Sequence, residues 1–220
     1  MSYTKRAIML SWLVLAASGA VWAQRGGMGG SMPAMPALQN PTPGSGAAYH
    51  MTVKGKEMDI AAVALGNETV EGNQGIWMEL RMNTPDTGGE MVWKTLTVNT
   101  AAEAGIKRMI VQRPGQAPME MPSMMMGMMH SKPSTAASSA GMGELVGTET
   151  VTVPAGTFTC QHYRKQGNNG PVDVWISKDV TPYAMVKMAS GDTTMELTKV
   201  LTNETSHIKG EPSKFQLPHF

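Results

Sequence analysis

The alternation of side chains between residues 76 and 82 constrains the fold of this chain more than any other feature. In this segment, IWMELRM, the residues Met78, Leu80 and Met82 would share one face of an extended chain, and the aromatic and charged residues between them would share the other. A period of two is typical of a half-buried β-strand, because successive side chains of a strand point to opposite faces. The segment therefore predicts a strand rather than a helix.

Short apolar and β-branched segments, separated by Gly, Asn, Asp and Pro, recur from residue 47 onward and predict further strands. The predicted strands are 48–53, 59–70, 76–82, 91–98, 106–112, 149–153, 157–166, 172–177, 184–189 and 193–202. Short connections favour antiparallel pairing, because parallel neighbours need crossovers of roughly a dozen residues or more. Helix is expected only as short turns at 100–104 and in a methionine-rich run. The sequence thus predicts a mainly β domain over residues 47–207, and a closed barrel, a curved half-barrel sheet and a β-sandwich all fit.

The two ends of the chain differ in character from this domain. Residues 1–23 place Lys5 and Arg6 before an apolar run and end in a small-x-small site, which is typical of a cleaved secretory signal. Residues 24–46, rich in Gly, Pro, Ser and Met, are predicted to be a disordered tether, and residues 208–220 a flexible tail. We therefore expect a bacterial protein that is soluble in the periplasm or the medium after export.

Composition excludes several classes of function. The only cysteine is Cys160, so no internal disulfide can form and the core alone must hold the exported domain together. The formal net charge is +1 and the charges are dispersed, which argues against nucleic acid as a partner. The chain contains no H-E-x-x-H, no G-x-S-x-G and no phosphate-cradling glycine loop. We therefore expect a protein that is not an enzyme and needs no cofactor.

The segment 119–143, MEMPSMMMGMMHSKPSTAASSAGMG, is predicted to be a long loop that divides the strands into two groups. Thioether sulfur suits Cu(I), so Met124, Met126, Met129 and His130 would be the ligands of a copper site. Methionine also occurs throughout the predicted strands as an adaptable core residue, and methionine-rich surfaces accommodate apolar partners. The loop is therefore a flexible apolar cover, a Cu(I) site or an inert segment.

Two pairs of neighbouring residues are further candidate sites. Cys160 and His162 would share one face of a strand, but no other ligand follows at a metal-binding spacing. We therefore expect Cys160 to be buried beside Phe158 as a small hydrophobic residue. Trp175 and Asp173 would also share a face, where they either contact a ligand or form a cross-strand pair.

A set of motifs in the C-terminal third resembles a known group of proteins. The sequence VPAGTF at 153–158 forms a turn into a strand, DVWIS at 173–177 gives the next strand, and PYAMVK at 182–187 the one after. This pattern resembles uncharacterised exported bacterial proteins, which look like distant members of the periplasmic lipoprotein-carrier superfamily. The resemblance implies one strongly curved antiparallel sheet, a half-barrel, that wraps an apolar cavity for acyl chains. The methionine-rich loop is the only candidate for the cover that helices provide in the carriers.

The preferred interpretation is a single curved antiparallel sheet with few short helices, with a β-sandwich as the alternative. Its expected function is the non-enzymatic binding of an apolar small molecule, a lipid or a protein segment, together with peripheral association with the bacterial envelope. The candidate ligand-binding residues are Met78, Leu80, Met82, Met119, Met121 and Trp175. The alternative function is periplasmic Cu(I) binding by the methionine-rich loop, with copper as the cofactor.

Overall fold

The computed structural model describes residue 38 and residues 41–99, 104–122, 142–167 and 170–214. The predicted signal at 1–23 lies outside these residues. The predicted tether, methionine-rich loop and tail are described only in part.

The described residues form twelve strands and one short 3₁₀ helix. These are β1 (Gly46–Val53), β2 (Lys56–Val70), β3 (Asn73–Thr84), η1 (Pro85–Thr87), β4 (Gly89–Asn99), β5 (Ala104–Gln112), β6 (Met119–Glu120), β7 (Glu144–Val153), β8 (Gly156–Gly167), β9 (Gly170–Ile176), β10 (Met185–Ser190), β11 (Thr193–Leu201) and β12 (Ser213–Lys214). Each strand predicted from the sequence corresponds to one of them. The strands β6 and β12 were not predicted, because two residues are too few to show a period. The predicted helical turns at 100–104 and in the methionine run lie largely outside the described residues.

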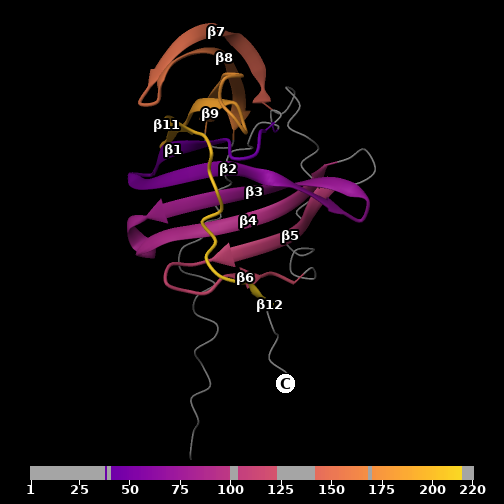
Figure 1. Cartoon of the computed structure of the whole chain (residues 1–220). Helices are drawn as coiled ribbons and strands as arrows, with labels where there is room; N and C mark the ends of the chain where they lie inside the picture. The colour runs from indigo at the N-terminus through magenta and orange to yellow at the C-terminus, as the bar shows by residue number, and fades with distance from the viewer. Residues whose placement is uncertain (1–37, 39–40, 100–103, 123–141, 168–169, 215–220) are drawn as a thin grey trace, which may run out of the picture. The chain divides into compact units, whose positions relative to one another are not determined.

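All twelve strands belong to one sheet, in the order β12-β6-β5-β4-β3-β2-β1-β11-β10-β9-β8-β7. Neighbouring strands are antiparallel, except that β12 runs parallel to β6. The sheet is open, with β12 and β7 as its terminal strands, and it curves so that β7 and β8 arch over one end in Figure 1. The prediction of a single curved antiparallel sheet is therefore confirmed, and the alternative β-sandwich is not found.

Two tight turns fix how β1, β2 and β3 follow one another. Lys54 and Gly55 connect β1 to β2 with φ values of 49° and 77°, and Glu71 and Gly72 connect β2 to β3 with φ values of 52° and 79°. Positive φ at both residues of a two-residue connection is the requirement of a type I′ turn, whose twist matches that of the flanking strands. Glycine meets this requirement at the second position because it has no Cβ. The turns thus set the register of three adjacent strands.

The hydrophobic core joins strands from both halves of the chain. Its buried members are Ala47, Tyr49, Met51, Ile60, Met82, Val153, Cys160, Val174, Val180, Met185, Val186, Met188, Met195 and Leu197. Methionine is well suited to such a core, since its unbranched side chain adapts to irregular gaps. Tyr49 brings a hydroxyl into this core, and the hydroxyl donates a hydrogen bond to the main-chain oxygen of Met185.

A buried ion pair on β3 departs from the simple alternation of apolar and polar faces. The side chain of Glu79 is fully buried and that of Arg81 is 5% exposed, although both lie on the face opposite Met78 and Met82. Arg81 Nε donates to Glu79 Oε1 at 2.8 Å, and its Nη1 donates to Glu204 Oε2 at 2.7 Å. The second oxygen of Glu79 accepts a hydrogen bond of 2.6 Å from the hydroxyl of Ser206.

The segment that covers this ion pair is residues 202–212, which we call the C-terminal strap. It leaves β11 and runs across β3, β4 and β5 to β12, as the yellow trace in Figure 1 shows. His207 contacts Glu90 on β4 at 2.8 Å, and the main chain of Lys209 exchanges hydrogen bonds with the side chain of Gln112 on β5. The predicted tail begins at residue 208. Its described residues, 208–214, form the end of the strap and β12. The strap therefore connects β11, an internal strand of the sheet, to β12 at one edge.

No helix in the described ranges has the length and apolar character needed to cross a membrane.

The substitution Arg81→Met tests the role of the buried ion pair. We expect it to lower the free energy of unfolding by about 3–5 kcal/mol, because Glu79 would remain buried without a counter-charge. Urea denaturation followed by circular dichroism measures this change. Lys56→Met is the matched control, since Lys56 pairs with Asp86 while 77% of its side chain is exposed, and it should have little effect. Equal losses in the two variants would contradict the prediction.

Candidate functional site

A row of polar side chains crosses the face of the sheet that carries Glu79 and Arg81. Each member stands directly opposite the next on the neighbouring strand, from β8 to β4. The row consists of His162, Trp175, Lys187, Glu196, His50, Asp59, Asn83 and Glu90. Directly opposed residues of a sheet project from the same face, so these side chains form one line, which we call the polar row. At its far end His207 of the strap contacts Glu90.

At the β8 end of the polar row, His162 lies between two carboxylates. Its Nε2 is 2.6 Å from Asp173 Oδ1, and its Nδ1 is 3.1 Å from Glu149 Oε1. The ring of Trp175 stacks on the imidazole with centroids 4.5 Å apart, and its indole N–H donates to Glu149. Both ring nitrogens of His162 therefore face acceptors, and the aromatic ring holds the imidazole in place.

Asp173 connects this cluster to the guanidinium group of Arg164. Its Oδ1 accepts a hydrogen bond of 2.7 Å from Arg164 Nε in addition to the contact with His162. Burial by itself would raise the pKa of Asp173, but the hydrogen bonds from Arg164 and His162 lower it below its ordinary value. The carboxylate is therefore stabilised in its charged form.

The middle of the polar row consists of ion pairs nearer to solvent. Lys187 Nζ lies 2.7 Å from Glu196 Oε1, and His50 Nδ1 lies 3.0 Å from Asp59 Oδ1. The hydrogen bond with Asp59 raises the pKa of His50 above its ordinary value. Because the side chain of His50 is 43% exposed, this pair contributes little to stability.

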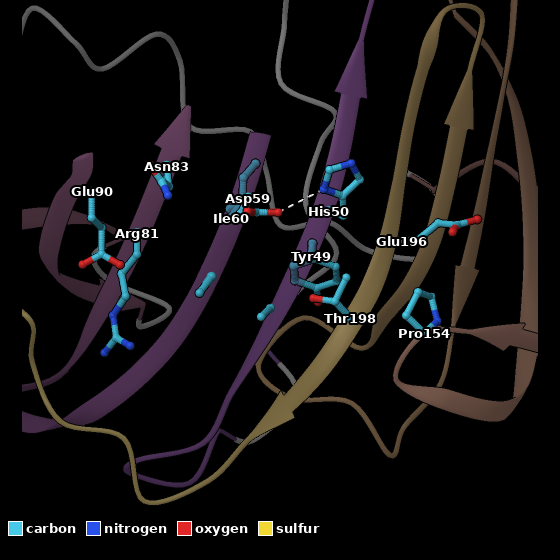
Figure 2. Close-up of a pocket in the computed structure, with 12 residues that line it drawn as sticks. Tyr49, His50, Asp59, Ile60, Arg81, Asn83, Glu90, Pro154, Glu196 and Thr198 are labelled. Atoms are coloured by element: carbon cyan, nitrogen blue, oxygen red, sulfur yellow. Dashed lines mark hydrogen bonds and ion pairs between the residues drawn. The ribbon is translucent and has the colours of Figure 1, made fainter. Parts of the chain in front are cut away.

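An open pocket of about 600 Å³ lies over this part of the sheet. Figure 2 shows Arg81, Asn83 and Glu90 along one side of it and Glu196 and Thr198 along the other, with the contact between His50 and Asp59 in between. Apolar lining comes from Ala48, Tyr49, Ile60, Ala61 and Pro154. Each charged lining residue already has a partner in the protein, as described above for His50, Asp59, Arg81, Glu90 and Glu196. Every charged side chain of the lining is therefore already in contact with another polar group of the protein.

Within the part of the chain that the structure describes, no three His, Cys, Asp or Glu side chains are arranged to hold a metal ion. Cys160 is fully buried, as predicted, and its thiol donates a weak hydrogen bond of 3.7 Å to the main-chain oxygen of Phe158. Burial, with a smaller contribution from Glu149, raises the pKa of this thiol to about 11. The thiol is therefore unreactive, and His162 is occupied by its carboxylates.

The structure does not bring the predicted ligand-binding residues together. Met78 and Met82 are 6% and 7% exposed, and Leu80 between them packs against the core. Trp175 belongs to the polar row, on the opposite face from Met82, since Asn83 and not Met82 is in that row. Half-buried Met119 and Met121 lie far along the sheet, at β6 and just after it.

The predicted copper ligands Met124, Met126, Met129 and His130 lie outside the described residues, so copper binding by the loop stays a prediction. Sequence reasoning missed most of the polar row, because its members come together only through the register of distant strands. The sequence signal for the row was the pair of Asp173 and Trp175, which share one face of β9: Trp175 is a member of the row, and Asp173 contacts its member His162.

Strand β7 forms a free edge of the sheet. It is ten residues long, it pairs with β8 on one side, and none of the described strands pairs with its other side. Leu145 and Val146 on this strand are 55% and 54% exposed, the highest values among the large hydrophobic residues that the structure describes as exposed. A β-bulge at Val146 interrupts the pairing with β8.

The lowered pKa of Asp173 makes the folded state sensitive to acid. A carboxylate with a depressed pKa stabilises the protein above its unfolded-state pKa of about 4, and this contribution is lost as the pH falls through the folded-state pKa. We expect Asp173→Asn to be less stable than the wild type at pH 7 and to lose less stability in acid below about pH 4. Melting temperatures across this range test the effect, with Asp86→Asn at an exposed pair as the control. An unchanged acid dependence in Asp173→Asn would contradict the assignment.

No curated protein matches the chain. Two solved structures are similar to it: a candidate lipoprotein from Parabacteroides distasonis ATCC 8503 (13% identity, TM-score 0.37) and a candidate exported protein with a YmcC-like fold from Bacteroides fragilis NCTC 9343 (10% identity, TM-score 0.33). Each match covers 75% of this chain and 99% of the solved chain. These likenesses are too loose to carry a function to this protein, and the resemblance to the lipoprotein carriers stays a prediction.

The family model described as "Domain of unknown function (DUF4412)" matches residues 57–215. The match begins at the start of β2 and extends through the strap to β12, so it covers most of the sheet. The chain therefore belongs to the DUF4412 family.

Proposed function

We propose that the protein is a non-enzymatic binding protein outside the cytoplasm, which captures an extended protein segment at the free edge of β7. The observation that carries the proposal is the ten-residue length of this edge with Leu145 and Val146 exposed on it. Export rests on the signal-like sequence at 1–23, and association with the envelope would follow if the captured segment belongs to an envelope protein.

The sequence of β7 favours strand addition. Natural sheets protect their edges with lysine, proline, short strands or strong bulges, because unpaired N–H and C=O groups recruit other chains. The β7 sequence ELVGTETVTV contains neither lysine nor proline and is rich in β-branched residues, and beyond the bulge at Val146 the strand from Gly147 to Val153 pairs regularly with β8. An incoming extended segment would form main-chain hydrogen bonds with this edge, and its alternate side chains would contact Leu145 or Val146.

The charges of β7 favour a basic partner. Its only charged side chains are Glu144 and Glu149, both exposed. Glu149 already contacts His162, whereas Glu144 lies at the exposed start of the strand. A segment with alternating apolar residues and with lysine or arginine opposite Glu144 would be complementary to this edge.

The packing of the sheet supports a protein segment over an apolar small molecule or lipid. The side chains predicted to line a cavity, such as Met78 and Met82, are buried in the protein itself. The pocket at the polar row is open, and its charged side chains already have partners within the protein. An acyl chain would need enclosed apolar space, since its affinity comes from the apolar area that it removes from water.

A peptide with the sequence of residues 144–153, in which both glutamates are replaced by lysine, is the probe for this function. We expect it to bind the wild-type protein, and Leu145→Ser/Val146→Ser to weaken binding about tenfold, equivalent to roughly 1.4 kcal/mol. Fluorescence anisotropy of the labelled peptide measures the dissociation constants. Val200→Ser is the matched control, because Val200 is 38% exposed but lies on the internal strand β11.

The unmodified peptide of residues 144–153 distinguishes the kinds of partner. Stronger binding of the lysine peptide supports a basic segment, whereas equal binding of the two peptides would point to a second copy of the chain. No binding of either peptide, or an equal loss in Val200→Ser, would sink the proposal.

A further inference from the structure

Four methionines stand side by side on four adjacent strands of the sheet. Met58 on β2 is directly opposite Met51 on β1, Met51 is opposite Met195 on β11, and Met195 is opposite Met188 on β10. These residues form a single cross-strand row, which we call the methionine row. Each member is adjacent in the sequence to a residue of the polar row, as Glu196 follows Met195 and His50 precedes Met51. Because successive residues of a strand point to opposite faces, the methionine row lies on the face opposite the polar row.

The geometry of the row allows the sulfur atoms to converge. Side chains directly opposite each other in an antiparallel pair have Cβ atoms roughly 4.5–5.5 Å apart. Methionine is unbranched and has three rotatable bonds, so neighbouring thioethers can turn toward a common point. Met51, Met188 and Met195 belong to the core, and Met58 packs against it.

We propose that Met51, Met58 and Met195 form a thioether site for Cu(I), with Met188 as a further sulfur behind them. Thioether sulfur is a soft ligand that favours Cu(I), and this ion accepts a low coordination number that three adjacent strands supply. The site is separate from the copper ligands predicted in the methionine-rich loop, and it does not depend on the binding of a segment at β7.

The exposure of the row changes along its length in a way that suits an ion. Met188 is fully buried, Met195 is 4% exposed, Met51 is 7% exposed, and Met58 is half-buried. Enclosing a charge far from water is costly, so the ion would sit at the Met58 end, close to the turn at Lys54 and Gly55. The same end gives the ion access from solvent.

Core packing alone would make a different demand on these residues. A core position requires apolar volume, which leucine supplies nearly as well as methionine. A metal site requires the sulfur itself. Methionine-to-leucine substitution therefore separates the two roles while preserving the fold.

The test is an anaerobic titration of the purified full chain with Cu(I) in competition with a chromophoric Cu(I) chelator. We expect Met51→Leu/Met195→Leu to lose one equivalent of chelator-resistant Cu(I) relative to the wild type. The matched control is Met78→Leu/Met109→Leu, two methionines of the same sheet that are 6% and 8% exposed but lie outside the row; it should keep that equivalent. Circular dichroism verifies that both variants are folded.

Copper bound by the methionine-rich loop is separated by a third variant, which carries His130→Gln and a Met→Leu substitution at each methionine of residues 119–129. This variant should retain the equivalent assigned to the methionine row, and X-ray absorption should show only sulfur neighbours around its copper. If it binds no Cu(I), or if the row and control variants bind the same amount, the methionine row is core packing and the proposal is wrong.

Discussion

The burial of Glu79 and Arg81 is the constraint on which the rest of the structure depends. Two charges taken out of water on an internal strand are tolerable only if every charged atom finds a partner. The directly opposed residues on the neighbouring strands provide no side-chain acceptor for Arg81, because they are Ala61 and Val92. The strap provides partners through Glu204, Thr205 and Ser206, and it thereby covers a face that would otherwise be open to solvent. The face that carries Glu79 and Arg81 combines these polar contacts with buried apolar side chains such as Val63, Val92 and Leu96, and the opposite face is packed mainly by apolar side chains.

The two faces of the sheet carry different candidate sites. The core side collects the methionines, and its apolar surroundings are where soft sulfur ligands are sheltered from water. The other side carries the polar row, in which side chains from His162 to Glu90 contact polar partners within the protein. The edge at β7 is different, because the outer side of its main chain pairs with none of the described strands. Among the described strands, β7 therefore offers a row of backbone N–H and C=O groups on its outer side, which accords with the proposed recognition of another chain.

The sequence predicted the strands well and the polar contacts poorly, for one physical reason. Alternation within a segment such as 76–82 is local, and it placed Met78 and Met82 inside correctly. The same alternation assigned Glu79 and Arg81 to a solvent-facing side, because their partner Glu204 is 123 residues from Arg81 along the chain. The burial of Cys160 was also predictable from its apolar setting. The polar row was not, since it arises from the register of strands that are distant in sequence, and the loop ligands from Met124 to His130 lie outside the described residues.

The strap also determines when folding can be completed. β1, near the start of the described chain, pairs with β11, and the ion pair on β3 awaits residues 204–206. Contacts between such distant parts of the chain form late, because the ends of long loops must first be brought together. In a chain that emerges N-terminus first, β1 therefore lacks its neighbour β11, and Arg81 lacks its acceptor on Glu204, until the C-terminal part has emerged. For an exported chain, as its first residues predict, this interval would coincide with translocation.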